Sequence, residues 1–205
     1  MEIRRTANAG VLLKLDDIHI LLDGVCQGIF PYLATPQQER VNLSNPWPDI
    51  VAFTHDHDDH WDAPYAQAYS KATGREVVRQ AASVGNVKLT AVPTRHMGRS
   101  GLTTKHVSFV ITGSKCVWFM GDAAPTQLKE LSDYPKPDVL MVPYPYVSTP
   151  AACKLLEAYL PCKILLLHLP SQTCDPEGLW QVIAPGLEQL KQYIVLPEMG
   201  ETITL

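Results

Sequence analysis

The stretch Thr54-His55-Asp56-His57-Asp58-Asp59-His60 decides how this sequence is interpreted. It places three of the seven histidines and three aspartates in six consecutive positions, directly after the apolar run Asp49–Phe53, which predicts a buried strand. Imidazole and carboxylate groups are the ligands that zinc, manganese and iron take at catalytic sites, where open positions remain for water and substrate. The stretch is therefore a candidate metal-binding loop.

The spacing within this loop favours two cations over one. In an extended segment His55 and His57 point the same way, so both can reach one cation. Asp59 and His60 follow where the chain turns into the next helix, and they can reach a second cation. The competing interpretation is a solvated acidic turn in which Asp58 or Asp59 caps that helix.

The regions around the loop alternate between strands and helices. Apolar periodicity predicts strands at Ile3–Thr6, Val11–Leu15, Ile18–Leu22, Asp49–Phe53, Val87–Val92, Val107–Thr112, Cys116–Met120, Val139–Val142 and Ile164–Leu167, and helices at Ala63–Lys71, Thr126–Leu131 and Ala151–Leu160. No low-complexity linker separates the halves, so we expect a single domain over residues 1–205 with two similar β/α halves, about 1–100 and 101–205. The expected architecture is a sheet sandwich with helices outside.

Residues 24–48 interrupt this pattern. The segment holds four prolines and the aromatic residues Phe30, Tyr32 and Trp47, which we expect to be exposed. It is too long for an ordinary connection between two elements. Loops of this kind serve as lids or as pocket walls.

Composition excludes several classes of function. Seventeen Lys and Arg against 21 Asp and Glu give a formal charge of −4, without the basic surplus that nucleic-acid binding requires. No apolar run approaches the ~20 residues of a membrane-spanning helix, and no export signal is visible. The five cysteines form no CxxC pair, which is typical of reduced thiols. We therefore expect a cytoplasmic protein that acts on a small-molecule substrate, with no nucleic acid and no membrane as partner.

Three further candidate ligands each follow a predicted strand. His96 comes after the strand that ends near Val92, Asp122 follows Cys116–Met120, and His168 follows Ile164–Leu167. Ligand and catalytic side chains gather at strand ends in α/β proteins. The other interpretations are a loop histidine for His96 and a helix cap for Asp122.

The pattern His55-x-His57-x-Asp59-His60 after a strand resembles the signature of the metallo-β-lactamase superfamily. The remainder of the chain supplies similar parts in the family's order: Ile20-Leu-Leu-Asp23-Gly24, His96, Phe119-Met-Gly121-Asp122 and His168. The run from Gly121-Asp122 to Pro137–Pro143 and His168 looks most like the branch of the ascorbate-6-phosphate lactonase. The fold that this resemblance implies is an α/β, four-layer αββα sandwich with its site where the edges of the two sheets meet.

The resemblance also implies a dinuclear metal site and a hydrolase. His55, His57 and His96 would hold one metal, Asp59, His60 and His168 the other, and Asp122 would bridge, so that Asp59 and Asp122 are the catalytic carboxylates. Two divalent transition-metal ions are implied, zinc first, with manganese or iron as alternatives, and the nucleophile would be a hydroxide between them. The substrate would be a small, anionic ester, lactone or phosphoester. An RNA-processing nuclease and an iron-dependent redox enzyme are the alternatives within the superfamily.

Several other residues are candidates for supporting roles. Arg95 and Arg99 could hold an anionic group of the substrate, or belong to the solvated surface. Tyr144 and Tyr146 could line the pocket and donate to an oxyanion, or serve as aromatic packing. Asp23 is either a turn residue or a buried acceptor that orients a ligand imidazole. A separate expectation concerns His106, which we place at the surface or behind the ligands.

Overall fold

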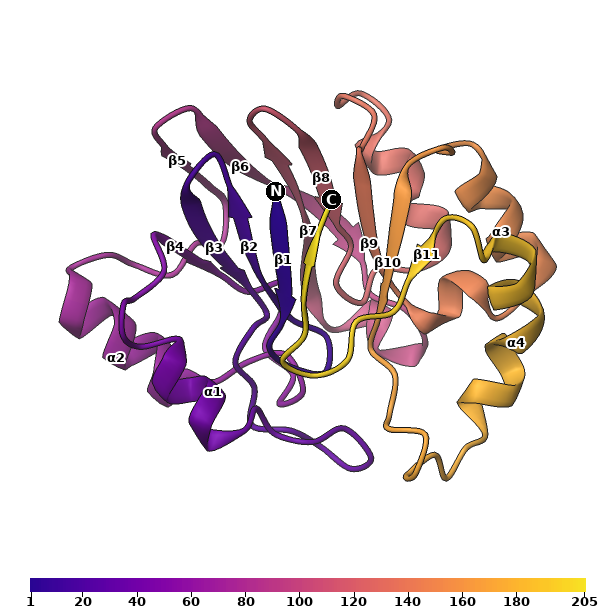
Figure 1. The fold of residues 1–205 in the computed structure, drawn as a ribbon, viewed down its shortest axis with the longest axis horizontal. Coiled ribbons are helices and arrows are strands. Elements are labelled where there is room, and N and C mark those ends of the chain that lie inside the picture. The colour runs from indigo at the N-terminus through magenta and orange to yellow at the C-terminus, as the bar shows by residue number, and fades with distance from the viewer.

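Two β-sheets pack face to face in the computed structural model, which describes residues 1–205 except for the side chain of Ser100 (Figure 1). The first sheet has the strand order β12-β1-β2-β3-β4 and the second has the order β11-β10-β9-β8-β7-β6-β5. The strands are β1 (Glu2–Arg5), β2 (Val11–Leu15), β3 (Ile18–Leu22), β4 (Ile50–Ala52), β5 (Ala81–Val84), β6 (Val87–Arg95), β7 (Lys105–Thr112), β8 (Cys116–Phe119), β9 (Val139–Pro143), β10 (Lys163–Leu167), β11 (Ile194–Val195) and β12 (Thr202–Thr204).

Helices cover the outer face of each sheet, so the layers follow the order αββα (Figure 1). The α-helices are α1 (Gln37–Asn42), α2 (Ala63–Thr73), α3 (Pro150–Glu157) and α4 (Leu179–Leu190), and the short 3-10 helices are η1 (Arg99–Leu102), η2 (Pro125–Leu131) and η3 (Tyr144–Val147). The predicted fold class is thereby confirmed. The expectation of one domain built from two similar halves stays a prediction; β5 and β6 of the first half pair in the second sheet, and β12 of the second half pairs in the first.

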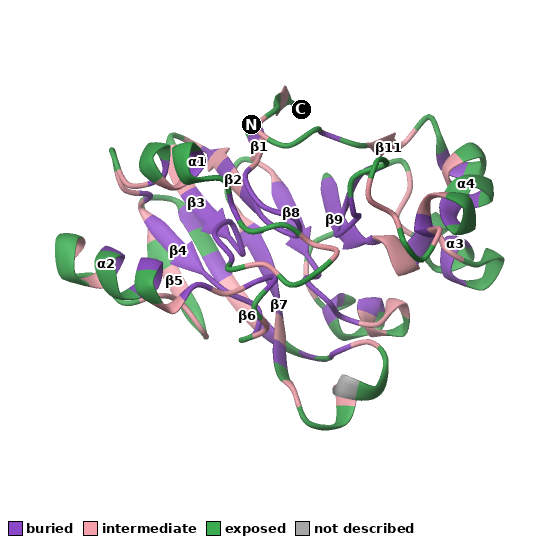
Figure 2. Ribbon diagram, turned by 90° about the horizontal axis from the view of Figure 1, so that it is seen from below, coloured by how far each residue is buried: buried purple, intermediate pink, exposed green. Residues whose placement is uncertain are grey.

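Apolar side chains between the sheets form the inner core. Leu13 and Ile20 from the first sheet and Phe109 and Met141 from the second are all buried there. The continuous apolar run of β10 serves two layers, because Leu165 and Leu167 enter this core while Ile164 and Leu166 pack under α3 and α4. Buried residues are therefore concentrated in the sheets, and exposed residues on the outer faces of the helices (Figure 2).

Strand direction brings several chain segments to one edge of the sandwich. β6 and β8 are both antiparallel to β7, and β8, β9 and β10 are mutually parallel. The carboxyl ends of β6, β8 and β10 consequently lie at the same edge. The end of β4 meets them there, since the N–H of Val107 donates to the carbonyl of Thr54 at 3.1 Å.

The segment after β10 contains structure that the sequence pattern did not reveal. Leu179, Ile183 and Leu190 of α4 pack into the core beneath the second sheet. Pro185 lies inside this helix, where it removes one backbone hydrogen bond. Because proline usually ends a helix, the sequence pattern did not predict one here. Gly186 lets α4 pack closely against the end of η3, because a Cβ at this position would lie 2.1 Å from the carbonyl oxygen of Val147.

The loop over residues 24–48 is also partly structured. It contains α1, and Trp47 packs against Tyr65 and Tyr69 of α2, so this tryptophan is not the exposed residue that we expected. Phe30 is exposed. Across the described residues, no helix combines the length and apolarity needed to cross a bilayer.

Candidate metal centre

The histidine and aspartate loop lies directly after β4, in the gap that the two sheet edges enclose. His55 and His60 are almost completely buried, Asp59 is buried, and His57 is partly exposed. The N-cap of α2 is Asp62, whose carboxylate accepts from the N–H of Tyr65, so neither Asp58 nor Asp59 is used to cap the helix. The capping interpretation of the loop is therefore wrong.

His96, Asp122 and His168 enter the same space from the ends of β6, β8 and β10. All three are buried, and each comes just after the last residue of its strand or within three residues of it. His168 has a left-handed backbone with φ of 59°, which is costly for a residue with a side chain. Its N–H donates to the carbonyl of Asn8 at 3.1 Å, which holds it in this conformation.

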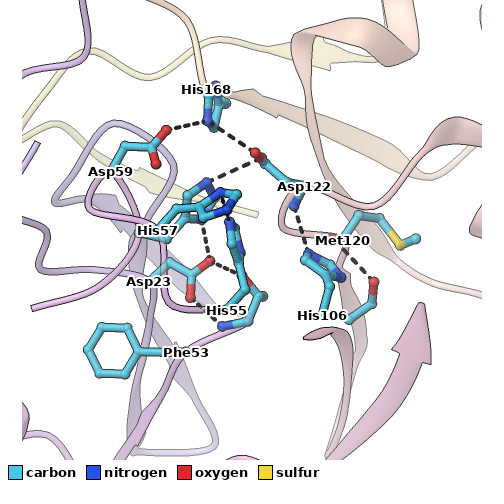
Figure 3. A network of polar contacts seen from close by, with 12 residues as sticks. Asp23, Phe53, His55, His57, Asp59, His106, Met120, Asp122 and His168 are labelled. Atoms are coloured by element: carbon cyan, nitrogen blue, oxygen red, sulfur yellow. Dashed lines mark hydrogen bonds and ion pairs between the residues drawn. The ribbon is translucent and has the colours of Figure 1, made fainter. Parts of the chain in front are cut away.

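The seven predicted ligands come together in two groups of three, with the carboxylate of Asp122 between them. Figure 3 labels His55, His57, Asp59, Asp122 and His168 of this set. One group is His55, His57 and His96, the other is Asp59, His60 and His168, and within each group the candidate ligand atoms lie within 4.8 Å of one another. Oδ1 of Asp122 lies 3.2 Å from Nε2 of His60, and its Oδ2 lies 3.5 Å from Nε2 of both His96 and His168. The carboxylate of Asp122 thus contacts both groups.

Asp23 supports the loop from behind. It is fully buried, with φ of 46°, and accepts from Nδ1 of His60 at 2.7 Å. It also accepts from the backbone N–H of Thr54 at 2.7 Å and from the hydroxyl of Thr54 at 2.6 Å. Asp23, His55 and His60 form a third group of potential ligands. Because these donors already occupy the carboxylate, its position favours orienting the histidines over binding a cation itself.

The hydrogen bonds assign which nitrogen of each imidazole is free. The hydroxyl of Thr54 gives its proton to Asp23, so the 2.9 Å contact with Nδ1 of His55 requires that this nitrogen donate. His96 likewise uses Nδ1 to donate to the carbonyl of Met97 at 2.7 Å. In both residues Nε2 then carries the lone pair, which is the form that binds a metal; in His55 this atom lies 3.0 Å from Nδ1 of His57.

Burial and charge set the ionisation of the cluster. Burial lowers the pKa of His55 and His57. For His60, burial opposes the charge, but the carboxylates of Asp122 and Asp23 outweigh it and raise its pKa well above the ordinary value. Burial also disfavours the charge of Asp122, yet the neighbouring His168 and His60 hold the pKa of Asp122 well below its usual range.

A transition-metal cation fits this arrangement. Within the described part of the chain, Nε2 of His60, Nε2 of His96 and Oδ1 of Asp122 are buried and make no well-formed hydrogen bond, although the first and the last of these atoms lie 3.2 Å apart. Buried polar atoms are rarely left without a partner, so the cluster has the properties of a site for a bound cation. Nitrogen and carboxylate donors in this number suit zinc, manganese or iron.

Comparison with known proteins agrees with this geometry. The family model described as the β-lactamase superfamily domain matches residues 2–159. The chain belongs to this family. Its histidine and aspartate residues are positioned to bind metal. No curated protein matches the sequence at a significant level.

Solved structures share the fold at low sequence identity. A possible metal-dependent hydrolase from Veillonella parvula DSM 2008 is 15% identical with a TM-score of 0.76, and the match covers 100% of this chain and 99% of that one. Isothiocyanate hydrolase from Delia radicum gut bacteria is 17% identical with a TM-score of 0.71, covering 100% and 99%. CmlA, a diiron β-hydroxylase from Streptomyces venezuelae, is 13% identical with a TM-score of 0.65, covering 100% of this chain and 54% of that one.

Behind Asp122, this β-lactamase superfamily domain has His106, for which the sequence left two positions open, the surface or behind the ligands; the second is confirmed. His106 is buried and not at the surface, and its Nε2 accepts from the backbone N–H of Asp122 at 3.0 Å (Figure 3). Its Nδ1 lies 2.8 Å from the hydroxyl of Thr94, which lies 2.9 Å from that of Ser108, which donates to the carbonyl of Met120. Burial lowers the pKa of His106 to about 3. No sequence signal indicated which of the ligands His106 would contact.

The predicted tyrosines divide into two kinds. Tyr146 is fully buried in the core under the second sheet, and its hydroxyl donates to the carbonyl of Ala124, so the expectation that it lines the pocket is wrong. Tyr144 is half-buried, with its ring 6.4 Å from that of His168. Tyr32, from the long loop, was not predicted as a site residue, yet its ring lies 4.4 Å from that of His168.

The predicted arginines lie away from the enclosed part of the site. Arg95 alternates with His96 along the chain and points outward, and Arg99 is on η1; both side chains are exposed. Neither lines the cavity of about 520 Å³ that lies next to His168; Asn8 and Tyr32, which contact His168, line this cavity, but His168 itself does not. That cavity is walled on one side by residues 31–36 of the long loop, which therefore serves as a pocket wall.

Proposed function

We propose that this chain is a metal-dependent hydrolase that uses two transition-metal ions to cleave a small ester, lactone or phosphoester. The reaction adds one water across the scissile bond and gives an acid and an alcohol. Lactone hydrolysis, the activity of the branch that the sequence resembles, is one member of this class.

The observation that carries the proposal is the position of Asp122. Its carboxylate contacts His96 of one ligand group and His60 and His168 of the other. Its Oδ2 contacts one histidine of each group and its Oδ1 contacts His60, so the carboxylate lies between the two donor sets, as a shared ligand requires. A single cation of four to six ligands would leave part of this seven-residue set unused.

When bound, two such cations would lower the pKa of a water toward neutrality and stabilise the negative charge that develops on the substrate. The residues of this chain orient the metal ligands and the substrate. Asp23 fixes the ring of His60 directly and that of His55 through Thr54. The rings of Tyr32 and Tyr144 lie 4.4 and 6.4 Å from that of His168, and we propose that their hydroxyls donate to a developing oxyanion.

The surroundings favour a small substrate. The adjoining cavity of about 520 Å³ has the size of sites that enclose drug-sized molecules. The net charge of −4 argues against the RNA-processing alternative.

An iron-dependent redox reaction is the second candidate. The donor set of histidine and carboxylate suits iron as well as zinc, and the fold is shared with the diiron CmlA. The reaction of the metal-loaded protein, hydrolysis against oxygen consumption, separates the two candidates.

The test is elemental analysis of protein prepared without chelator, coupled to one panel of substrates. The panel holds a lactone, a carboxylic ester, a phosphodiester, a thioester, an isothiocyanate and single-stranded RNA, with oxygen uptake measured in parallel. We expect hydrolysis of an ester, lactone or phosphoester that is lost with His60→Ala and kept with the control Asp133→Ala, an exposed aspartate away from the centre. Oxygen consumption by iron-loaded protein without hydrolysis, or RNA cleavage alone, would contradict the proposal.

A further inference from the structure

The cavity beside His168 is built from segments that lie far apart in the sequence. Residues 31–36 form one wall, residues 169–173 with Trp180 form another, and residues 196–199 close the end. Most of these side chains are apolar. Two polar residues of the first strand and its turn, Arg5 and Asn8, also line the cavity.

Asn8 has an amide that nothing in the described protein satisfies. The residue is 3% exposed, and its Nδ2 is buried without a hydrogen-bond partner. Its backbone carbonyl is occupied, because it accepts from the N–H of His168 at 3.1 Å. A buried amide without a partner is unfavourable unless a ligand supplies one. Asn8 therefore links the cavity directly to a residue of the metal centre.

Arg5 brings a positive charge to the same cavity. Its guanidinium donates only to backbone carbonyls, those of Ala7, Pro197, Asn8 and Leu169, at distances of 3.2 to 3.4 Å. Among the described residues, no carboxylate forms an ion pair with it. These contacts use four of the five N–H groups of an arginine and neutralise none of its charge. Burial accordingly lowers the pKa of Arg5.

We propose, resting on the hydrolase function above, that Arg5 and Asn8 bind a carboxylate of the substrate that takes no part in the reaction. The substrate class is then an ester or lactone with a short apolar body and one free carboxylate. The apolar walls enclose the body, and the carboxylate supplies the negative charge that Arg5 lacks and the acceptor that Asn8 lacks. Water still adds across the ester bond alone, and the second carboxylate leaves unchanged.

The charges around the cavity favour one negative charge over two. Glu198 lines it, and Glu177 is close enough to raise the pKa of both Tyr32 and Tyr144, although burial is the larger cause for each. A single guanidinium beside these carboxylates matches a monoanion better than a dianionic phosphate. Exposed Arg95 and Arg99, the anion-binding residues expected from the sequence, do not line this space.

Trp180 provides a direct reporter of binding, since it lines the cavity and donates from Nε1 to the carbonyl of Pro170. The protein as isolated, with its metal, is titrated with hexanoate, hexanamide and hexyl phosphate while tryptophan fluorescence is followed. The variant Trp180→Phe identifies the part of the signal that comes from this residue. We expect hexanoate to bind more tightly than hexanamide by about tenfold or more, and more tightly than hexyl phosphate.

Variants decide which residues are responsible. Asn8→Ala and Asn8→Asp should remove the preference for hexanoate, the second by direct repulsion, and Arg5→Lys should weaken it. Gln172→Ala, an exposed residue of the same cavity, and the double variant Arg95→Ala/Arg99→Ala should keep it. Circular dichroism identifies any variant that does not fold. If only one of the two Asn8 variants folds, the titration of that variant decides the result.

Equal binding of hexanoate and hexanamide, or a preference that survives both Asn8 variants, would overturn the proposal. So would loss of binding in the Arg95/Arg99 variant alone. The titration needs no turnover, so its result is independent of the substrate panel. A hydrolase without the hexanoate preference and a hexanoate-binding protein without hydrolysis are separate, visible outcomes.

Discussion

The backbone N–H of Asp122 donates a hydrogen bond to Nε2 of His106 at 3.0 Å, on the side opposite to the carboxylate. Since Nε2 accepts, the proton of the neutral ring is on Nδ1, which donates to the hydroxyl of Thr94. The chain of donors ends at the carbonyl of Met120, two residues before Asp122. His106 thus fixes the backbone that carries the central carboxylate, and it can do so only while uncharged.

The neutral state of His106 has a measurable effect on stability. Burial lowers its pKa to about 3, against 6.5 for an exposed histidine. Between these values the unfolded chain holds a proton there that the folded chain lacks, so the free energy of unfolding falls as the pH falls. His106→Gln should reduce this slope by about 1.4 kcal/mol per pH unit between about pH 3 and 6.5.

Urea unfolding followed by circular dichroism, with chelator in every sample, measures that slope. His19→Gln is the matched control, because His19 is partly exposed on β3 and away from the centre. Equal slopes for wild type and His106→Gln would mean that His106 titrates normally in the folded protein.

Local signals made the strands and the ligand loop predictable. The loop from His55 to His60 combines a buried strand before it with ligand chemistry at fixed spacing, and each later ligand ends an apolar run. Such signals need only the neighbouring residues. The αββα arrangement followed from the alternation of elements and from the family resemblance.

Contacts over long sequence distances were not predictable in the same way. Tyr146 and Tyr144 are two residues apart, yet the hydroxyl of Tyr146 bonds in the core, whereas the ring of Tyr144 lies 6.4 Å from that of His168. The role of Arg5 and Asn8 could not be predicted, because the cavity that they line forms only when residues 169 and 197 fold against Arg5. The helix α4 was hidden because Pro185 interrupts its pattern.

Replacement of Asp23 should weaken metal binding without direct loss of a ligand. Asp23→Asn presents an amide to donors from Thr54 and His60, so His60 and His55 lose their orientation. We expect metal affinity to fall by about 10–100-fold. Metal competition with a chromophoric chelator measures it.

Asp62→Asn is the matched control for that variant. Asp62 is equally a buried aspartate, but it caps α2 and pairs with Arg40 at 2.6 Å. It should lower stability and leave metal affinity unchanged. A similar loss of affinity in both variants would show that general destabilisation is the cause.

The two tyrosines of η3 should respond in opposite ways. Tyr146→Phe removes a buried hydrogen bond to Ala124 and should lower the free energy of unfolding by about 0.5–1.5 kcal/mol, with turnover unchanged. Tyr144→Phe should leave stability unchanged and lower kcat by about 100-fold if its hydroxyl stabilises an oxyanion. Thermal melts and steady-state kinetics on both variants compare them; normal kcat in Tyr144→Phe would assign this residue to packing.

The metal content of Asp122→Ala, measured beside that of wild type, tests the shared carboxylate most directly. Wild type prepared without chelator should hold about two transition-metal ions per chain, and Asp122→Ala about one, with turnover lower by several orders of magnitude. The variant should stay folded by circular dichroism, because the inner core does not involve this residue. Two tightly held ions and near-normal turnover in Asp122→Ala, or a wild-type content that never exceeds one, would contradict a centre bridged by Asp122.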